Sequence, residues 1–252
     1  DGKTKDEVVD DIHSYQNEAD IPLLIGVDEE GGTVVRVSSN PNLRETPFLS
    51  PKDTYADGGW DAVKQDAEEK ADLLLSLGIN VNLAPVCDMT SDEYGFMYDR
   101  SFSSDVDMEN RYVRTVVETS KSKKLGTVLK HFPGYGNNSD THKGIAYDDR
   151  DYSEFENTDF KPFYQGIESG ADCILVSHNI VNCMDSEYPA SLSQKVHDIL
   201  RNEFKFDGVI MTDDLIMDAI TDFTGDEAAA VTAAKCGNDL LCCSSVDTQY
   251  PA

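Results

Sequence analysis

The chain has 252 residues, with 21 Lys and Arg against 48 Asp and Glu, which gives a formal net charge of −27 at pH 7. Hydrophobic residues make up 39% of it, enough for one sizeable core. The acidic excess argues against binding to nucleic acid or to anionic lipid, because both of these partners require basic patches.

Six short, nearly continuous apolar runs alternate with helical patterns, and no linker rich in Pro, Gly or Ser divides the chain. Such runs are typical of parallel strands that are buried on both faces. The expected helices are residues 5–15, 61–77, 108–124, 152–169, 195–204 and 227–235, and the expected strands are residues 21–28, 79–85, 126–132, 171–178, 208–214 and 238–243. Repeated strand–helix units predict a single α/β domain, residues 1–252, with right-handed crossovers.

Polar side chains follow the ends of successive expected strands, among them Asp28, Lys130, His178 and Asp213. A (β/α)8 TIM barrel places its active-site groups in this way. An open doubly wound sheet would usually carry a glycine-rich phosphate loop, and none is present in the sequence. Six strands leave such a barrel incomplete. Because the segment before residue 21 reads as a helix, we expect an N-terminally truncated barrel without its first two strands.

The six cysteines form no C-x-x-C pair, and four of them lie within apolar runs. We interpret these as small core residues rather than as disulfides or a metal site. This pattern slightly favours a cytoplasmic location, while a secreted or cell-wall-associated one stays open.

The most informative segment follows the third expected strand and begins with Lys130 and His131. Asp140 precedes His142 by two residues, so its carboxylate can accept a hydrogen bond from the imidazole and raise the basicity of the other ring nitrogen. A histidine held in this way can donate and recover a proton near neutral pH. The alternative is an incidental histidine on a polar surface loop, and the pair at the strand end favours the catalytic interpretation.

Three further segments carry candidate groups. Asp213 follows a buried strand and could act as a nucleophile, a base or a metal ligand, while Asp214 could cap the next helix. Asp28 and Arg36 flank a diglycine turn and suit the vicinal hydroxyls of a sugar, although a structural ion pair between them is equally compatible with the sequence. Arg100 could enter the same pocket from a loop.

Together these segments resemble glycoside hydrolase family 3, in the branch of bacterial β-N-acetylglucosaminidases that includes the muropeptide-recycling enzyme. The resemblance runs from about Ile21 to Cys243. Its ordered motifs occupy residues 28–36, 82–88, 99–102, 130–136, 140–142 and 212–214. The D-T-H element at 140–142 discriminates best, because the β-glucosidase branch lacks it. Tyr135 stands where the commoner family form has His, and residues 137–139 make that loop about one residue shorter than usual.

The resemblance implies a retaining exo-glycosidase that removes terminal β-linked N-acetylglucosamine from peptidoglycan fragments or chitin-type oligosaccharides, with no cofactor and no metal. Asp213 would form the glycosyl-enzyme, and His142, oriented by Asp140, would be the general acid/base. The resemblance assigns sugar binding to Asp28, Arg36, Arg100, Lys130 and His131, with His178 on the same pocket wall. The glycan is the only partner that this implies, and the oligomeric state stays open.

Several alternatives stay open. A phosphorolytic variant is one, because a neutral imidazole repels an anionic acceptor less than a carboxylate does. A β-glucosidase of the same family and a sugar-binding barrel without turnover are two others. A metal-dependent hydrolase could use His131, His178 and Asp213, but the cation of Lys130 disfavours a metal there. A doubly wound redox fold is disfavoured by the missing phosphate loop.

Overall fold

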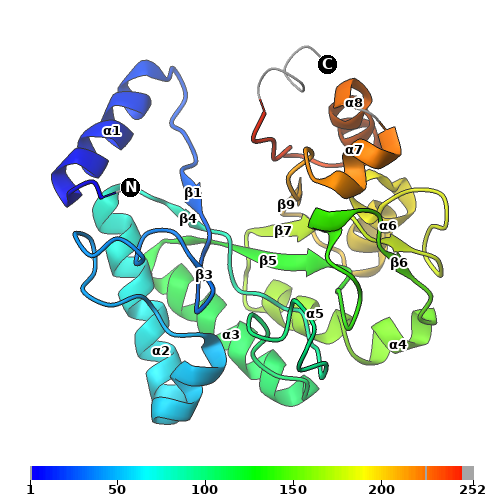
Figure 1. Ribbon diagram of the computed structural model, residues 1–252, viewed down its shortest axis with the longest axis horizontal. Coiled ribbons are helices and arrows are strands. Elements are labelled where there is room, and N and C mark those ends of the chain that lie inside the picture. The colour runs from blue at the N-terminus through cyan, green and yellow to red at the C-terminus, as the bar shows by residue number, and fades with distance from the viewer. Residues whose placement is uncertain (1, 225, 246–252) are drawn as a thin grey trace.

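The computed structural model describes residues 2–224 and 226–245 and is built around a curved parallel sheet (Figure 1). Its strand order is β1-β4-β5-β7-β9. These strands are β1 (Gly26–Val27), β4 (Val81–Asn82), β5 (Gly126–Phe132), β7 (Cys173–Val176) and β9 (Val209–Thr212). A parallel bridge between Met211 and Leu240 adds the sixth expected strand at the far edge. All six therefore lie in the expected order, and the parallel half-barrel confirms the expected incomplete (β/α)8 architecture.

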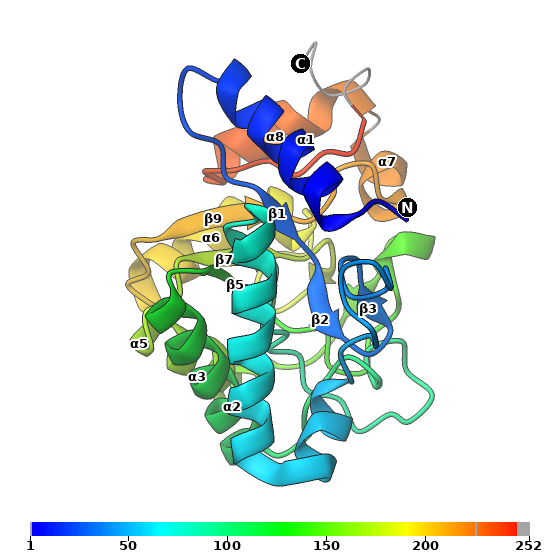
Figure 2. The ribbon, with the colours of Figure 1, turned by 90° about the vertical axis from the view of Figure 1, so that its left-hand side faces the viewer.

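Helices flank the sheet (Figure 1). They are α1 (Lys5–Glu18), α2 (Pro51–Leu77), α3 (Val106–Lys123), α4 (Tyr152–Asn157), α5 (Phe160–Glu168), α6 (Gln194–Asp198), α7 (Asp218–Thr224) and α8 (Asp226–Cys236). Figure 2 shows α2 and α3 side by side along one flank, and α3 also packs on α5. Within residues 2–224 and 226–245, no helix combines the length and the apolar character needed to cross a lipid bilayer.

Local signals explain where the long helices begin and end. Ser50 caps α2 by accepting a hydrogen bond from the Asp53 amide, and Pro51 occupies the first turn. Gly78 ends α2 with a φ of 90°, in the left-handed region that favours glycine. Asp105 caps α3. Ser50 and Asp105 thus set where α2 and α3 begin, and Gly78 sets where α2 ends.

The structure differs from the expected elements in a few places. The helix expected over 152–169 is broken, because Thr158 leaves helical geometry and α5 starts anew after it. The helix expected over 195–204 continues beyond α6 as a π-helical turn, Ile199–Glu203. The sequence did not predict α7, nor the short pairs β2 (Glu29–Gly31) with β3 (Val34–Val35) and β6 (Tyr147–Asp148) with β8 (Ile180–Val181). Elements this short carry too few residues for a periodic signal.

An aromatic cluster anchors the end of β5. The ring of Phe132, the last residue of this strand, lies 5.6 Å from that of Phe160, 5.2 Å from that of Phe163 and 5.4 Å from that of Phe204. All four side chains are buried. Aromatic packing of this kind holds the strand end rigidly. Lys130 and His131 directly precede Phe132. Their side chains are therefore attached to a backbone that is held in place.

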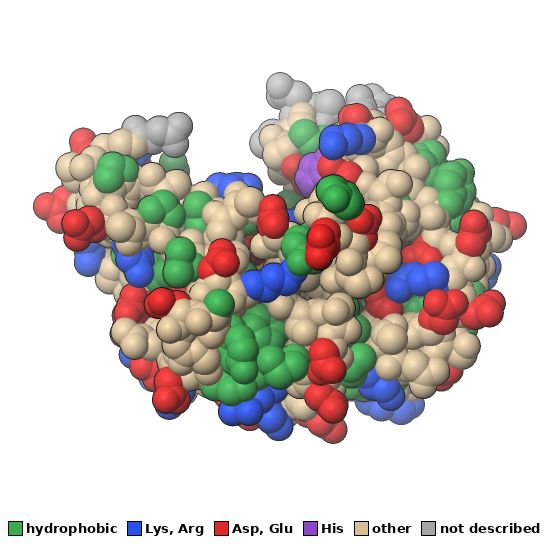
Figure 3. Space-filling view, turned by 60° about the horizontal axis from the view of Figure 1, so that its bottom comes forward, with side chains coloured by type: hydrophobic (Ala, Val, Ile, Leu, Met, Phe, Trp, Pro, Cys, Tyr) green, Lys and Arg blue, Asp and Glu red, His purple; other side chains and the backbone are tan. Residues whose placement is uncertain are grey.

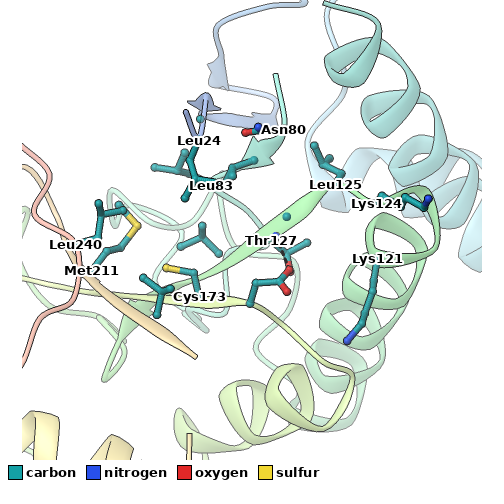
Figure 4. Close-up of a pocket in the computed structure, with 16 residues that line it drawn as sticks. Leu24, Asn80, Leu83, Lys121, Lys124, Leu125, Thr127, Cys173, Met211 and Leu240 are labelled. Atoms are coloured by element: carbon teal, nitrogen blue, oxygen red, sulfur yellow. Dashed lines mark hydrogen bonds between the residues drawn. The ribbon is translucent and has the colours of Figure 1, made fainter. Parts of the chain in front are cut away.

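The two ends of the sheet differ in chemistry. At the amino-terminal ends of the strands, an apolar cavity of about 510 Å³ extends from Leu24, beside β1, to Leu240, beyond β9 (Figure 4). Leu83, Cys173 and Met211 lie between them. The carboxyl ends of the same strands carry the polar and charged groups. Acidic side chains on the rest of the surface are scattered over the face shown in Figure 3 rather than gathered in one patch.

Candidate active site

A cavity of about 550 Å³ lies at the carboxyl ends of the strands. Phe96, Tyr135 and Met217 give it apolar walls beside its charged groups. Seven of the nine side chains predicted for the site line this cavity: Asp28, Arg36, Arg100, Lys130, His131, His142 and Asp213. The remaining two, Asp140 and His178, do not line it. The carboxyl ends of β1, β5 and β9 and three other segments of the chain thus converge on one space.

A buried ion network forms the floor of the cavity. Lys130, whose side chain is 2% exposed, donates from Nζ to Asp28 Oδ1 and lies 2.6 Å from both that atom and Glu30 Oε1. Burial alone would lower the pKa of Lys130, but Glu30 and Asp28 raise it, so the ammonium group stays charged. Arg100 donates to both carboxylate oxygens of Glu30, at 3.0 and 2.7 Å.

Glu30 is a member of this network that the sequence did not single out. Burial would raise the pKa of its carboxyl, but Lys130 and Arg100 outweigh that effect and lower it to about 2. A signal was available, because residues two apart on an extended strand share a face. Asp28 and Glu30 are two apart, so the second carboxylate was predictable from the first.

Asp88 fixes the orientation of His131. Asp88 Oδ2 accepts from the backbone amide of His131 at 3.0 Å and lies 2.7 Å from its Nδ1, and the carboxylate is fully buried. The Arg100 guanidinium lies 3.2 Å from Nε2 of the same ring. Arg100 can only donate, so Nε2 accepts and Nδ1 carries the proton that is donated to Asp88. The tautomer of His131 follows from these two contacts.

Asp213 lies half-buried just past β9 and faces the cavity. Burial alone would raise its pKa, but His178, His131, the amide of Asp214 and the ammonium of Lys130 lower it below its usual value. The Asp214 amide donates to Asp213 Oδ1 at 2.9 Å. The carboxylate is therefore ionised at neutral pH, as a nucleophile must be.

His178 does not line the cavity, which corrects its expected place on the wall. It is fully buried, with Nδ1 2.7 Å from Ser191 Oγ and Nε2 3.0 Å from the carbonyl oxygen of Asp214. Burial lowers the pKa of its imidazole. Both nitrogens are engaged by the protein, so His178 supports the 213–214 turn from below. The metal alternative, which needed His178 as a ligand, loses that ligand.

Two smaller expectations also change. Asp214 does not cap the next helix, since α7 starts only at Asp218. Its carboxylate instead accepts from the amides of Ile216 and Ser244, at 3.3 and 3.0 Å. The alternative ion pair between Asp28 and Arg36 is replaced by the pair between Asp28 and Lys130.

The Asp140–His142 pair stands on a loop at the rim. Asp140 Oδ1 accepts from the amide of His142 at 3.0 Å and lies 2.8 Å from its Nδ1. Burial would raise the pKa of Asp140, but these contacts lower it. The His142 side chain is 62% exposed and lines the cavity. Since Nδ1 faces Asp140, Nε2 is the nitrogen left for a bound molecule.

The whole chain matches a known family. A model described as glycosyl hydrolase family 3 N terminal domain matches residues 2–250. A beta-hexosaminidase of Hydrogenovibrio crunogenus is 34% identical over 224 residues, which cover 87% of this chain and 62% of that protein. A beta-hexosaminidase of Nitrosomonas eutropha is 32% identical over 249 residues, which cover 96% of this chain and 70% of that protein.

A solved structure agrees. The glycoside hydrolase family 3 β-N-acetylglucosaminidase of Paenibacillus sp. str. FPU-7 superposes with a TM-score of 0.91 at 28% identity, covering 98% of this chain and 48% of that one. The chain thus spans from about half to about two thirds of the length of these relatives. With the family model matching almost end to end, the chain belongs to glycosyl hydrolase family 3.

Proposed function

We propose that this site hydrolyses terminal β-linked N-acetylglucosamine with net retention of configuration. The observation that carries the proposal is one cavity lined by an ionised carboxylate, Asp213, and by an imidazole, His142, held through Asp140. A carboxylate can attack an anomeric carbon, and an imidazole can exchange a proton near neutral pH. The two groups supply the two roles that a double displacement requires.

The first step forms a covalent intermediate. An Asp213 oxygen bonds to the anomeric carbon while the bond from that carbon to the leaving oxygen breaks, and protonated His142 gives its Nε2 proton to that oxygen. In the second step His142 takes a proton from water. The resulting hydroxide oxygen bonds to the anomeric carbon and displaces the Asp213 carboxylate. Each step inverts the carbon, so the product retains the β configuration.

The floor of the cavity suits a polyhydroxylated ring. Asp28 offers an acceptor for hydroxyl groups, while Lys130 and Arg100 offer donors. The ion pairs of Lys130 with Asp28 and of Arg100 with Glu30 hold these side chains in place before any ligand arrives. Groups held in this way lose little conformational entropy on binding. The sugar would therefore bind to a surface whose geometry is already set.

The preference for N-acetylglucosamine is supported by the names of the relatives, which are beta-hexosaminidases and a β-N-acetylglucosaminidase. The natural leaving group would be a peptidoglycan fragment or a chitin-type saccharide. A half-exposed imidazole at the rim would tolerate inorganic phosphate as the acceptor in the second step, because it carries no negative charge. Phosphorolysis is therefore the variant to be separated from hydrolysis.

The test uses the full chain with p-nitrophenyl β-N-acetylglucosaminide and p-nitrophenyl β-glucoside. We expect release of p-nitrophenol mainly from the first. Proton NMR of the first-formed product should show β-N-acetylglucosamine, and mass spectrometry of a quenched reaction should show a glycosyl adduct on the peptide that contains Asp213. An α product would contradict the double displacement. A sugar phosphate formed in phosphate buffer would favour phosphorolysis over hydrolysis.

A further inference from the structure

The loop that carries Asp140 and His142 is joined to the floor of the site through Tyr135. This tyrosine is 2% exposed and lines the cavity. Its hydroxyl oxygen lies 2.6 Å from Oγ1 of Thr141, the residue between Asp140 and His142. Thr141 is fully buried, whereas the His142 side chain beside it is 62% exposed. The exposed turn is thus held by a buried contact at its centre.

Tyr135 is itself fixed on three sides. Its amide donates to Asp88 Oδ1 at 2.7 Å, on the carboxylate that also holds His131. Its ring packs edge to face on Phe96, at 5.0 Å, and on His131, at 5.3 Å. Asp88 and Tyr135 therefore connect a residue of the sugar-binding floor to the turn that carries the imidazole.

Other contacts reach the same loop, one at its tip and one at the turn itself. Thr90 Oγ1 donates to Asn137 Oδ1 at 2.7 Å, and η1 (Thr141–Lys143) packs against α7. The Thr90 contact holds the tip of the loop, four residues before Thr141, and does not orient the turn. The contact from Tyr135 to Thr141 acts on the residue whose backbone joins the two members of the pair.

We propose that the Tyr135 hydroxyl is a positioning group that sets the Asp140–Thr141–His142 turn over the cavity. This rests on the proposed role of His142 as acid/base. Tyr135 is also where the chain departs from the commoner histidine of its family, so the tether is a property of this chain. Because Tyr135 acts through Thr141, it affects proton transfer to the leaving group and leaves the attack by Asp213 intact.

The test compares two leaving groups. Tyr135→Phe keeps the ring packing and removes only the hydroxyl, and Thr141→Val removes the partner with little change in volume. For N,N′-diacetylchitobiose, whose leaving group needs a proton, we expect kcat/KM to fall by roughly threefold to tenfold in either variant, in line with the loss of one hydrogen bond. For the 2,4-dinitrophenyl glycoside, whose leaving group needs none, kcat/KM should stay within about twofold. In the double variant, kcat/KM for diacetylchitobiose should fall no further than in either single variant, because both substitutions remove the same contact.

An independent readout does not depend on turnover. Hydrogen–deuterium exchange over residues 139–145 should speed up by roughly threefold to tenfold in Tyr135→Phe, while exchange in β5 stays unchanged. Tyr112→Phe is the matched control, since Tyr112 is also buried but does not line the cavity. It should change neither rate nor exchange.

The outcomes distinguish a failure of the tether from a failure of the proposed function. An equal loss on both substrates, or unchanged kinetics together with unchanged exchange, overturns the tether. If the wild-type chain turns over neither substrate, or His142→Ala turns over the chitobiose normally, the proposed function fails. Exchange over residues 139–145 then decides alone whether Tyr135 holds the turn.

Discussion

The site is built from two unlike halves. The sheet supplies Lys130, His131 and Asp213, which are buried or half-buried and fixed by ion pairs and strand hydrogen bonds. The rim loop supplies Asp140 and His142, and the imidazole side chain is 62% exposed. Groups that hold and attack a sugar need preorganisation, whereas a group that exchanges protons with water needs access to solvent. The difference in burial therefore matches the difference in proposed task.

The largest loss of activity is expected for Asp213→Asn, which removes the proposed nucleophile of the sheet half. The amide is no nucleophile, so we expect kcat for the p-nitrophenyl substrate to fall on the order of 10⁴-fold, with little change in folding. Asp214→Asn is the matched control. The Asp214 carboxylate also lines the cavity, but its Oδ1 accepts from the backbone amides of Ile216 and Ser244, so kcat should fall far less in this variant. Comparable losses of kcat in both variants would show that activity depends on the structure of the 213–214 turn and that Asp213 is not the nucleophile.

His142→Ala tests the loop half. For diacetylchitobiose, kcat/KM should fall by about 10²–10⁴-fold, because general acid catalysis is lost. For the dinitrophenyl glycoside it should stay within a few-fold, and added azide should restore turnover by replacing activated water. The free energy of unfolding should barely change, since the side chain is exposed. A loss independent of the leaving group would contradict the acid role.

Lys130→Met tests the sheet half. It leaves Asp28 and Glu30 without the ammonium group that neutralises them, so we expect the free energy of unfolding to fall by about 3–5 kcal/mol in urea denaturation. Lys64→Met is the control, because its pair with Glu68 is exposed and 3.8 Å long. Its effect should stay within about 0.5 kcal/mol. Equal effects would mean that the buried network adds nothing to stability.

The pH dependence of stability tests the buried ion network of the sheet half. The folded-state pKa of Glu30 is about 2, below the ordinary value of 4.5 for a glutamate carboxyl. Its stabilising contribution is thus present above pH 4.5 and is lost as pH falls toward 2, by at most about 1.4 kcal/mol per pH unit. In Glu30→Gln, the free energy of unfolding measured by urea denaturation should fall less steeply as the pH drops below 4.5. If the variant loses stability toward low pH as steeply as the wild type, the loss is due to other carboxyl groups.

Much of this arrangement was predictable because parallel strands end on one edge, and side chains that follow those ends must meet. What failed depended on contacts distant in the chain. Asp88 closes the motif at residues 82–88, but its partner His131 lies 43 residues later. His178 follows β7 as predicted, yet contacts with Ser191 and Asp214 draw its ring into the core. Tyr135 was noticed as a departure, while its contact with Thr141 depends on how the loop folds back.

The apolar cavity at the opposite end of the sheet has a thermodynamic consequence. Leu24 is 72% exposed and Leu240 is 42% exposed, so part of the interior surface of the half-barrel already contacts water. The heat capacity rises on unfolding because buried apolar surface becomes exposed to water. Surface that already contacts water in the folded state adds nothing to this rise. The heat-capacity increment per residue should therefore lie below the ~12–15 cal/mol/K typical of globular proteins. The urea m-value should be correspondingly small for a chain of this length.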